Sequence, residues 1–296
     1  MKYLIITNPA SGKHKSISTL NGLLIPYLKE KNINYESFIT KEPLDAQNEL
    51  NSCNLNDINR IIVLGGDGTM HEVINGMLTR KDNKNLPVGL LPTGSGNSLL
   101  HDFKQLNIKD TLKKILNEQT QKIDLLEINT PKEKLFSTNM IGWGMVNDIG
   151  YQAENLRWIG PARYNVSSII QIFKYQPRKA TIEVDGKSYN SNFAFIMVCN
   201  TIHVGKGMKM APKACLKDGK MDLIIIKNNF SRIKLLQMFP KLFSGNHIKS
   251  ELVKYVQAKS FTLYPEINEE LNIDGDMKAM TPITITVASK KITLLN

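Results

Sequence analysis

Long hydrophobic runs are missing from this chain. No uninterrupted apolar segment among its 296 residues approaches the ~20 residues that span a bilayer. The N-terminus leads directly into a predicted strand, so we expect no export signal. The composition, 42% hydrophobic and 22% charged, is typical of a globular protein of one large or two smaller domains.

Cysteine is also scarce. Cys53, Cys199 and Cys215 are odd in number and lack the spacing of metal ligands. We interpret them as reduced thiols of a cytoplasmic protein. Arginine-rich tails, zinc-finger spacings and basic repeats interleaved with aromatic residues are absent too, so we predict no nucleic-acid partner.

Acidic residues are outnumbered by basic ones, 27 to 38, which gives a net charge of +11. Such a balance suits an anionic membrane or a polyphosphate substrate, and it also arises when lysines simply solvate a surface. Near an anionic bilayer each Lys or Arg contributes roughly 1 kcal/mol. A protein that visits an anionic membrane transiently, cytoplasmic but peripheral at that membrane, is therefore one expectation.

Two common phosphate-binding motifs are missing. The segment Asn8–Lys13, which follows the first predicted strand, lacks the leading glycine and the spacing of a P-loop. No Gly-x-Gly-x-x-Gly follows that strand either. A dinucleotide site of the Rossmann type is therefore unsupported.

What the chain does contain is Gly65-Gly66-Asp67-Gly68-Thr69, between a predicted buried strand over 61–64 and a helix predicted over 70–78. Glycines let a backbone approach an anion, and the first N–H groups of a helix point toward it. Asp67 would repel a bare phosphate, so it needs another task, either binding Mg²⁺ or accepting a hydroxyl proton. Phosphoryl transfer requires both, although such a turn can also merely join two elements.

Two similar loops favour the functional interpretation. Asn8–Lys13 follows a strand predicted over 3–7, and Pro92–Asn97 follows another over 88–91. Ligands of open parallel sheets bind at the carboxyl ends of the strands. The three loops therefore predict one ligand site at one edge of a sheet.

The pattern of predicted secondary structure changes near residue 129. Before it, predicted strands alternate with helices (20–28, 99–116), which indicates an α/β domain with a parallel sheet over 1–128. After it, short strands such as Thr181–Val184, which stops at Asp185-Gly186, predict an antiparallel β-sandwich over 129–287. A final strand within 288–296 could complete the first domain or return to the second.

A helical stretch from about Gln152 to Phe173 interrupts the β half, with a predicted break at Gly160-Pro161. It is unusually apolar and carries Arg157 and Arg163. A core element whose arginines extend to solvent would explain this pattern without any function.

With these segments in place, the chain resembles the diacylglycerol-kinase catalytic-domain family of lipid kinases, which includes bacterial diacylglycerol kinases and the sphingosine and ceramide kinases. The resemblance covers essentially the whole chain. It is carried by 65–69 with His71-Glu72-Val73 and Asn75-Gly76, by 91–97 with Asn8-Pro9, and by Asn272–Asp276, where Asp276 replaces a glutamate.

The segment 144–164 resembles the sphingoid and ceramide branch of that family. Gly150, however, stands where sphingosine kinases carry a second acidic residue that is thought to hold the substrate amine. Ceramide, diacylglycerol and related lipid alcohols therefore stay open.

The resemblance implies an NAD-kinase/phosphofructokinase-like α/β domain and a β-sandwich, with ATP in a cleft between them. It implies ATP and Mg²⁺ as cofactors, a lipid alcohol as substrate partner, and a monomer or homodimer. The residues it implies for ATP are Asn8, Thr40, Gly65, Gly66, Gly68, Thr69, Thr93, Gly94, Ser95, Asn97, Arg157, Arg163, Gly275 and Asp276.

For catalysis the resemblance implies Asp67 and Asp274, and for the substrate Asp148 and Glu154. We favour Asp67 as the base that accepts the hydroxyl proton, while Asp67, Asp274 and Asp276 are candidates to hold Mg²⁺. Bacterial relatives place a structural Mg²⁺ at the aspartate that matches Asp218, which is otherwise a simple turn residue.

The predicted function is ATP-dependent transfer of the γ-phosphate to the hydroxyl of a lipid alcohol of diacylglycerol, sphingoid-base or ceramide type. One alternative is an NAD kinase or sugar-phosphate kinase of the same superfold. Another is a catalytically weak module that binds lipid or nucleic acid.

Overall fold

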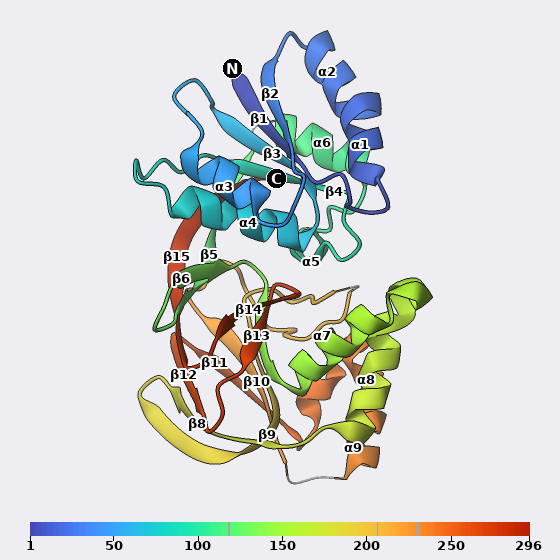
Figure 1. Ribbon diagram of the computed structural model, residues 1–296, viewed down its shortest axis with the longest axis vertical. Coiled ribbons are helices and arrows are strands. Elements are labelled where there is room, and N and C mark those ends of the chain that lie inside the picture. The colour runs from blue at the N-terminus through green and yellow to red at the C-terminus, as the bar shows by residue number, and fades with distance from the viewer. Residues whose placement is uncertain (118, 206, 229–230) are drawn as a thin grey trace. The chain divides into compact units, whose positions relative to one another are not determined.

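The computed structural model describes residues 1–117, 119–205, 207–228 and 231–296, without the side chains of Arg157 and Pro161. The chain forms two compact units (Figure 1). Unit 1 comprises Met1–Ile123 with Lys290–Asn296, and unit 2 comprises Asp124–Ser289. The chain passes from one unit to the other within two strands, β5 (Thr120–Asn129) and β15 (Ile283–Leu295).

Unit 1 is built on a parallel sheet with the strand order β4-β3-β1-β2. The end of β15 joins this sheet beside β4, where Leu294 lies opposite Val88 in parallel register. Its other elements, in chain order, are β1 (Lys2–Thr7), α1 (Lys15–Thr19), the π-helical turn η1 (Leu20–Leu24), α2 (Ile25–Glu30), β2 (Asn34–Ile39), α3 (Asp45–Ser52), β3 (Arg60–Gly65), α4 (Asp67–Leu78), β4 (Val88–Pro92), α5 (Ser98–Asp102) and α6 (Ile108–Leu116).

Helices pack on this sheet because β1, β3 and β4 are buried on both faces, as the strands of parallel sheets are. Tyr3 and Ile5 share a core cluster with side chains from η1, α2 and α6. Helices α3 and α4 pack against each other. Their close approach depends on Gly76, where a Cβ atom would lie 2.3 Å from the carbonyl oxygen of Gln47.

The predicted helix over 99–116 is wrong in one respect, because the structure divides it into α5 and α6. Lys104 has a positive φ of 55°, which no helix accommodates. A new helix then starts at Asn107, whose side chain accepts hydrogen bonds from the amides of Lys109 and Asp110 (3.0 and 3.2 Å).

Unit 2 is antiparallel. Its strands follow the order β14-β13-β7-β9-β8-β12-β15, and β9 also pairs with β10, which pairs with β11. In chain order its elements are β6 (Lys134–Ser137), β7 (Met140–Gly144), α7 (Met145–Asn155), the 3₁₀ segment η2 (Arg157–Ala162), α8 (Arg163–Lys174), β8 (Arg178–Val184), β9 (Lys187–Cys199), β10 (Met221–Lys227), α9 (Arg232–Met238), α10 (Lys241–Ser244), η3 (Asn246–Lys249), β11 (Val253–Ala258), β12 (Ser260–Pro265), β13 (Glu270–Ile273) and β14 (Asp276–Met280).

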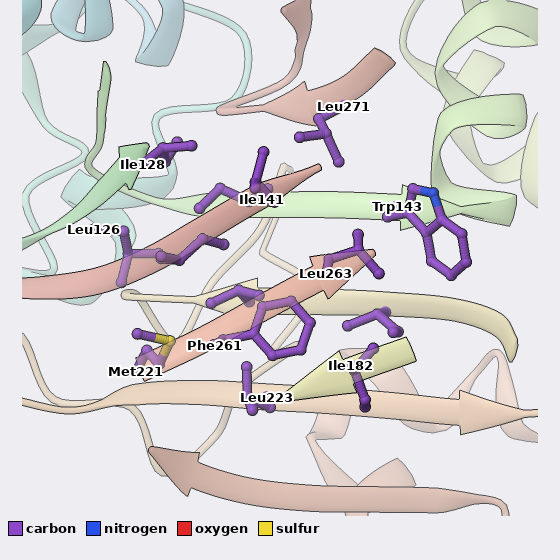
Figure 2. Close-up of a cluster of buried hydrophobic side chains, with 14 of the residues drawn as sticks. Leu126, Ile128, Ile141, Trp143, Ile182, Met221, Leu223, Phe261, Leu263 and Leu271 are labelled. Carbon is purple, nitrogen blue, oxygen red and sulfur yellow. The ribbon is translucent and has the colours of Figure 1, made fainter. Parts of the chain in front are cut away.

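Unit 2 has two apolar clusters, and the one in Figure 2 is contributed by strands far apart in the sequence. Leu126 of β5, Ile141 and Trp143 of β7, and Phe261 of β12 meet there. The predicted sandwich is thus confirmed. The predicted hairpin at Asp185-Gly186 is confirmed as well, since both residues have positive φ between β8 and β9.

Two expectations about unit 2 need correction. The strands predicted over 283–287 and 291–295 are one continuous strand, β15. The helical stretch begins at Met145 rather than near Gln152, because α7 starts directly after β7. The predicted break is confirmed at Gly160, whose φ and ψ of 64° and −138° interrupt η2.

Much of this helical stretch is not core. Helix α8 buries Ser167 and Ile172, whereas Ile169 and Phe173 are exposed, and Trp158 in η2 is 82% exposed. None of the described helices has the length and hydropathy required to cross a bilayer.

Candidate active site

The three predicted loops meet at the carboxyl edge of the unit 1 sheet. The Asn8 amide donates to the Leu64 carbonyl, and the Gly94 amide donates to the Gly65 carbonyl, both at 3.0 Å. A Cβ atom on Gly12 would lie 2.0 Å from the carbonyl oxygen of Thr93. The expected clustering of loops after β1, β3 and β4 is therefore confirmed.

Glycine is required where the second and third loops touch. A Cβ atom on Gly94 would lie 2.3 Å from the Cα of Gly66, a distance that no side chain tolerates. The two backbones thus lie against each other without intervening side chains. Bare backbone of this kind, next to the first turn of α4, suits an anionic group such as a phosphate.

Asp67 is the first residue of α4, and its carboxylate is hydrogen-bonded to the first residue of another helix, α5. Its Oδ2 accepts hydrogen bonds from both the amide and the Oγ of Ser98, each at 3.0 Å. Ser98 begins α5. Sequence reasoning missed this partner, and the available signal was a serine that directly follows the third loop at the start of a helix.

Amide and hydroxyl groups of the other loops face one another. Asn8 Nδ2 donates to Thr69 Oγ1 at 3.2 Å, and Thr93 Oγ1 donates to the Gly65 carbonyl at 3.3 Å. Asn97, in a left-handed conformation, donates to the Gly94 carbonyl at 2.8 Å. Its Oδ1 is buried and has no hydrogen-bond partner within the described part of the chain.

The remaining ATP candidates of unit 1 differ in exposure. Thr40 is buried directly after β2, and its amide donates to the Thr7 carbonyl at 2.9 Å. Ser95 is exposed at the tip of the third loop, and Gly68 lies in the first turn of α4.

Asp274 lies in unit 2 and is enclosed by hydrogen-bond donors. Its Oδ1 accepts from Ser137 Oγ (2.6 Å) and from the amides of Asn139 (2.9 Å) and Met140 (3.0 Å). Its Oδ2 accepts from the amide and hydroxyl of Thr138 (3.1 and 3.4 Å). This buried carboxylate therefore ties the β13–β14 turn to the segment between β6 and β7.

Asp276, two residues later, is exposed where Asp274 is buried. Its carboxylate is exposed and forms an ion pair with Lys278 at 3.3 Å. Gly275 between the two aspartates has a φ of 102°, which favours glycine. The turn thus buries one carboxylate and presents the other to solvent.

Asp148 on α7 is engaged by an arginine that the sequence did not reveal. Arg178 donates to both of its oxygens (2.8 and 3.0 Å) and, through Nε, to Glu269 Oε1 (2.7 Å). Burial disfavours the charge of Arg178, but the hydrogen bonds to the two carboxylates outweigh it and raise the pKa of Arg178. No local pattern links residues 30 positions apart, so this contact had no signal.

The other candidate residues of this region form longer contacts than Asp148 does. Arg163 lies 3.5 Å from Glu154 and stacks at 4.9 Å over the ring of Tyr164. Arg157 was predicted to contact ATP, and its side chain lies outside the described residues. Asp148 and Arg178 line an open depression of about 600 Å³ between α7 and α8, together with polar residues such as Gln152 and Lys174.

Comparison with known families assigns both units. Residues 2–128 match the diacylglycerol kinase catalytic domain, and residues 139–296 match the YegS C-terminal NAD kinase β-sandwich-like domain. The chain belongs to the diacylglycerol kinase and sphingosine kinase family. It is a lipid kinase, and ATP is its phosphate donor.

Named relatives of this lipid kinase come from both branches. Sphingosine kinase 1 of Arabidopsis thaliana is 26% identical over 93% of this chain and 67% of its own length. A diacylglycerol kinase of Mycobacterium tuberculosis is also 26% identical, over 99% of this chain and 94% of its own. The solved structure of a diacylglycerol kinase from Bacillus anthracis shares the fold, with a TM-score of 0.73, 22% identity and coverage of 99% and 96%.

Asp218 of this lipid kinase occupies an exposed turn, where its Oδ1 accepts from the Lys220 amide at 3.0 Å. The neighbouring Asp124 braces the same turn by accepting from the Gly219 amide at 2.8 Å. Among the described residues, no three His, Cys, Asp or Glu side chains gather into a metal-binding group. The second Mg²⁺ expected at Asp218 stays a prediction.

Proposed function

We propose that this lipid kinase transfers the γ-phosphate of ATP to the hydroxyl of a neutral lipid alcohol of the diacylglycerol class. The observation that carries the choice of acceptor is the double hydrogen bond between Arg178 and Asp148 (2.8 and 3.0 Å). Both oxygens of this carboxylate are already engaged by a cation.

A sphingoid base would bring its own cation, an ammonium group, to the same acidic residue. It would have to displace Arg178 and leave a half-buried guanidinium with one carboxylate fewer, which is costly. Gly150 supplies no second acid to compensate, and a Cβ atom there would lie 3.1 Å from Asn272 Nδ2. A neutral hydroxyl acceptor meets neither difficulty.

For the chemistry, we assign Asp67 as the group that accepts the acceptor's hydroxyl proton. Ser98 holds its carboxylate from two donors, which fixes the orientation a base needs. The glycine loops around Gly66 and Gly94 hold the phosphates.

Mg²⁺ fits this donor set, because it prefers oxygen ligands and commonly takes only one or two carboxylates beside phosphates and water. The exposed Asp276 would hold it, and it would neutralise charge on the transferred phosphoryl group. Asp274 already accepts five hydrogen bonds. We therefore assign Asp274 to shaping the turn that presents Asp276.

The test is label transfer from γ-labelled ATP, with Mg²⁺, to diacylglycerol, ceramide and sphingosine in mixed micelles. We expect diacylglycerol to be the preferred acceptor, and Asp67→Asn to lower kcat about a hundredfold or more without changing the thermal unfolding midpoint. Asp57→Asn, at an exposed position of unit 1, is the matched control. Preferential labelling of sphingosine would refute the acceptor assignment, and near-normal turnover in Asp67→Asn would exclude Asp67 as the base.

A further inference from the structure

Two large apolar side chains protrude from the helical segment that follows β10. Ile233 on α9 is 63% exposed and Phe243 on α10 is 42% exposed. Most exposed apolar residues are scattered singly and need no explanation. These two belong to a short segment, 231–250, which we call the α9–α10 face.

The charge of this face is of one sign. Residues 231–250 contain four basic residues and no acidic one, in a chain that has 27 acidic residues in all. The basic side chains are exposed alongside Ile233 and Phe243, and they are Arg232, Lys234, Lys241 and Lys249.

The face is rigidly attached to unit 2. Leu235 and Met238, on the opposite side of α9, are buried in the second apolar cluster of that unit, together with Ile172 of α8. Helices α8 and α9 are in contact, and the Arg232 guanidinium lies 5.9 Å from the ring centre of Tyr175, just after α8. The face therefore adjoins the end of α8 that exposes Phe173 (Figure 1).

Lysines from another loop extend the same charge. The Lys209 amide donates to the Leu242 carbonyl at 2.9 Å, next to α10, and the Lys209 side chain is exposed. Lys213, also exposed, follows in this loop, with its ammonium 5.7 Å from the ring of Tyr255. Ile233 and Phe243 thus belong to a surface region that is rich in basic side chains.

We propose that the α9–α10 face docks on an anionic phospholipid bilayer, with Ile233 and Phe243 entering the boundary between headgroups and acyl chains. Apolar side chains framed by Lys and Arg are the pattern of interfacial membrane binding. This rests on the proposed function, since the lipid acceptor resides in a bilayer.

Charge complementarity selects this occupant over a second copy of the chain. In a two-fold symmetric dimer the same patch faces itself, so the four basic residues of 231–250 would meet four others, with a single acid, Glu251, next to the segment in sequence. An anionic bilayer instead attracts every one of them.

Co-sedimentation with vesicles tests the proposal directly. The wild-type protein is expected to bind vesicles of phosphatidylglycerol and phosphatidylcholine, to bind pure phosphatidylcholine weakly, and to be released by salt. Ile233→Ser is expected to lower the partition coefficient about tenfold, because it removes one inserted side chain. Lys234→Glu should lower it at least fivefold.

Matched controls separate docking from general surface change. Ile267→Ser removes an isoleucine that is even more exposed (75%) from the β12–β13 connection, and Lys132→Glu reverses an exposed charge between β5 and β6. Both are expected to bind vesicles as the wild type does. If Ile233→Ser and Lys234→Glu also bind like the wild type, or instead alter only self-association or RNA retention, the proposal is wrong.

A short-chain diacylglycerol below its micellar concentration distinguishes this proposal from the proposed function. Ile233→Ser should phosphorylate that monomeric acceptor at the wild-type rate while losing activity on vesicles. Vesicle binding without any lipid phosphorylation would overturn the function and retain the docking face. Phosphorylation without vesicle binding would do the reverse.

Discussion

Asp274 and Asp276 show that two carboxylates of one motif serve different purposes. Sequence spacing places both in a single turn and cannot say which is buried. Asp274 is enclosed because Ser137, Thr138, Asn139 and Met140, more than 130 positions away, converge on it. A carboxylate with so many donors is an anchor, whereas its exposed neighbour is available to a ligand.

Replacing Asp274 and Asp276 by asparagine, one at a time, should distinguish the structural carboxylate from the one that binds a ligand. Asp274→Asn replaces one acceptor oxygen by an NH₂ group that faces donors, so unit 2 should lose roughly 3 kcal/mol of unfolding free energy. Asp276→Asn should change stability by less than about 0.5 kcal/mol and act on turnover instead. Chemical denaturation and kcat, measured on both variants, check this. Equal loss of stability in the two would contradict the assignment.

Helix α4 illustrates what a local pattern could predict and what it could not. A helix after the glycine turn and its apolar face followed from residue order, since they depend on neighbours in sequence. The predicted start at Met70 was wrong, because α4 begins at Asp67, within the turn. The role of Gly76 did not, because it depends on α3 lying against this helix. Likewise, the helical pattern over 99–116 did not predict the break between α5 and α6. The hydrogen bonds between Arg178 and Asp148 were not predictable either, because the two residues are 30 positions apart.

Two alanine substitutions test the packing argument at α4. Gly76→Ala would place its Cβ 2.3 Å from the Gln47 carbonyl oxygen, so we expect unit 1 to lose about 1–3 kcal/mol. Gly22→Ala, in η1, has no atom within 4 Å of the added Cβ and should gain about 0.5–1 kcal/mol from its lower chain entropy. Denaturant midpoints report both signs, and a stabilised Gly76→Ala would rule out the close contact.

For the whole molecule, the family and the two fold classes were predictable because motifs and strand periodicity extend along the entire chain. The pH dependence of the unfolding free energy was not predictable, because it depends on which titratable side chains are buried. His247 is fully buried, with Nε2 3.0 Å from the Met210 carbonyl. Burial lowers its pKa, even though the carbonyls of Met210 and Lys241 favour the charged ring.

Acidification should therefore destabilise unit 2. Above about pH 6.5, the ordinary value for histidine, His247 is neutral in both the folded and the unfolded chain, and no stability is lost. Below it, the unfolded chain takes up a proton that the folded one resists, so the unfolding free energy falls.

His247→Gln, which retains an amide donor for Met210, should flatten this slope between pH 7 and 5. Asp222, whose pKa is raised by burial, contributes the opposite slope in both proteins and cancels in the difference. Parallel slopes for wild type and variant would argue against the histidine.

The route of the chain through β15 determines the order in which the protein can be completed during synthesis. Ile292, Leu294 and Leu295 are buried in unit 1, beside a strand that ends at Pro92. They leave the ribosome only after residues 124–289 have been made. Unit 1 is thus the first to begin folding and the last to be completed, because β4 lacks its partner strand on one side until β15 has been made.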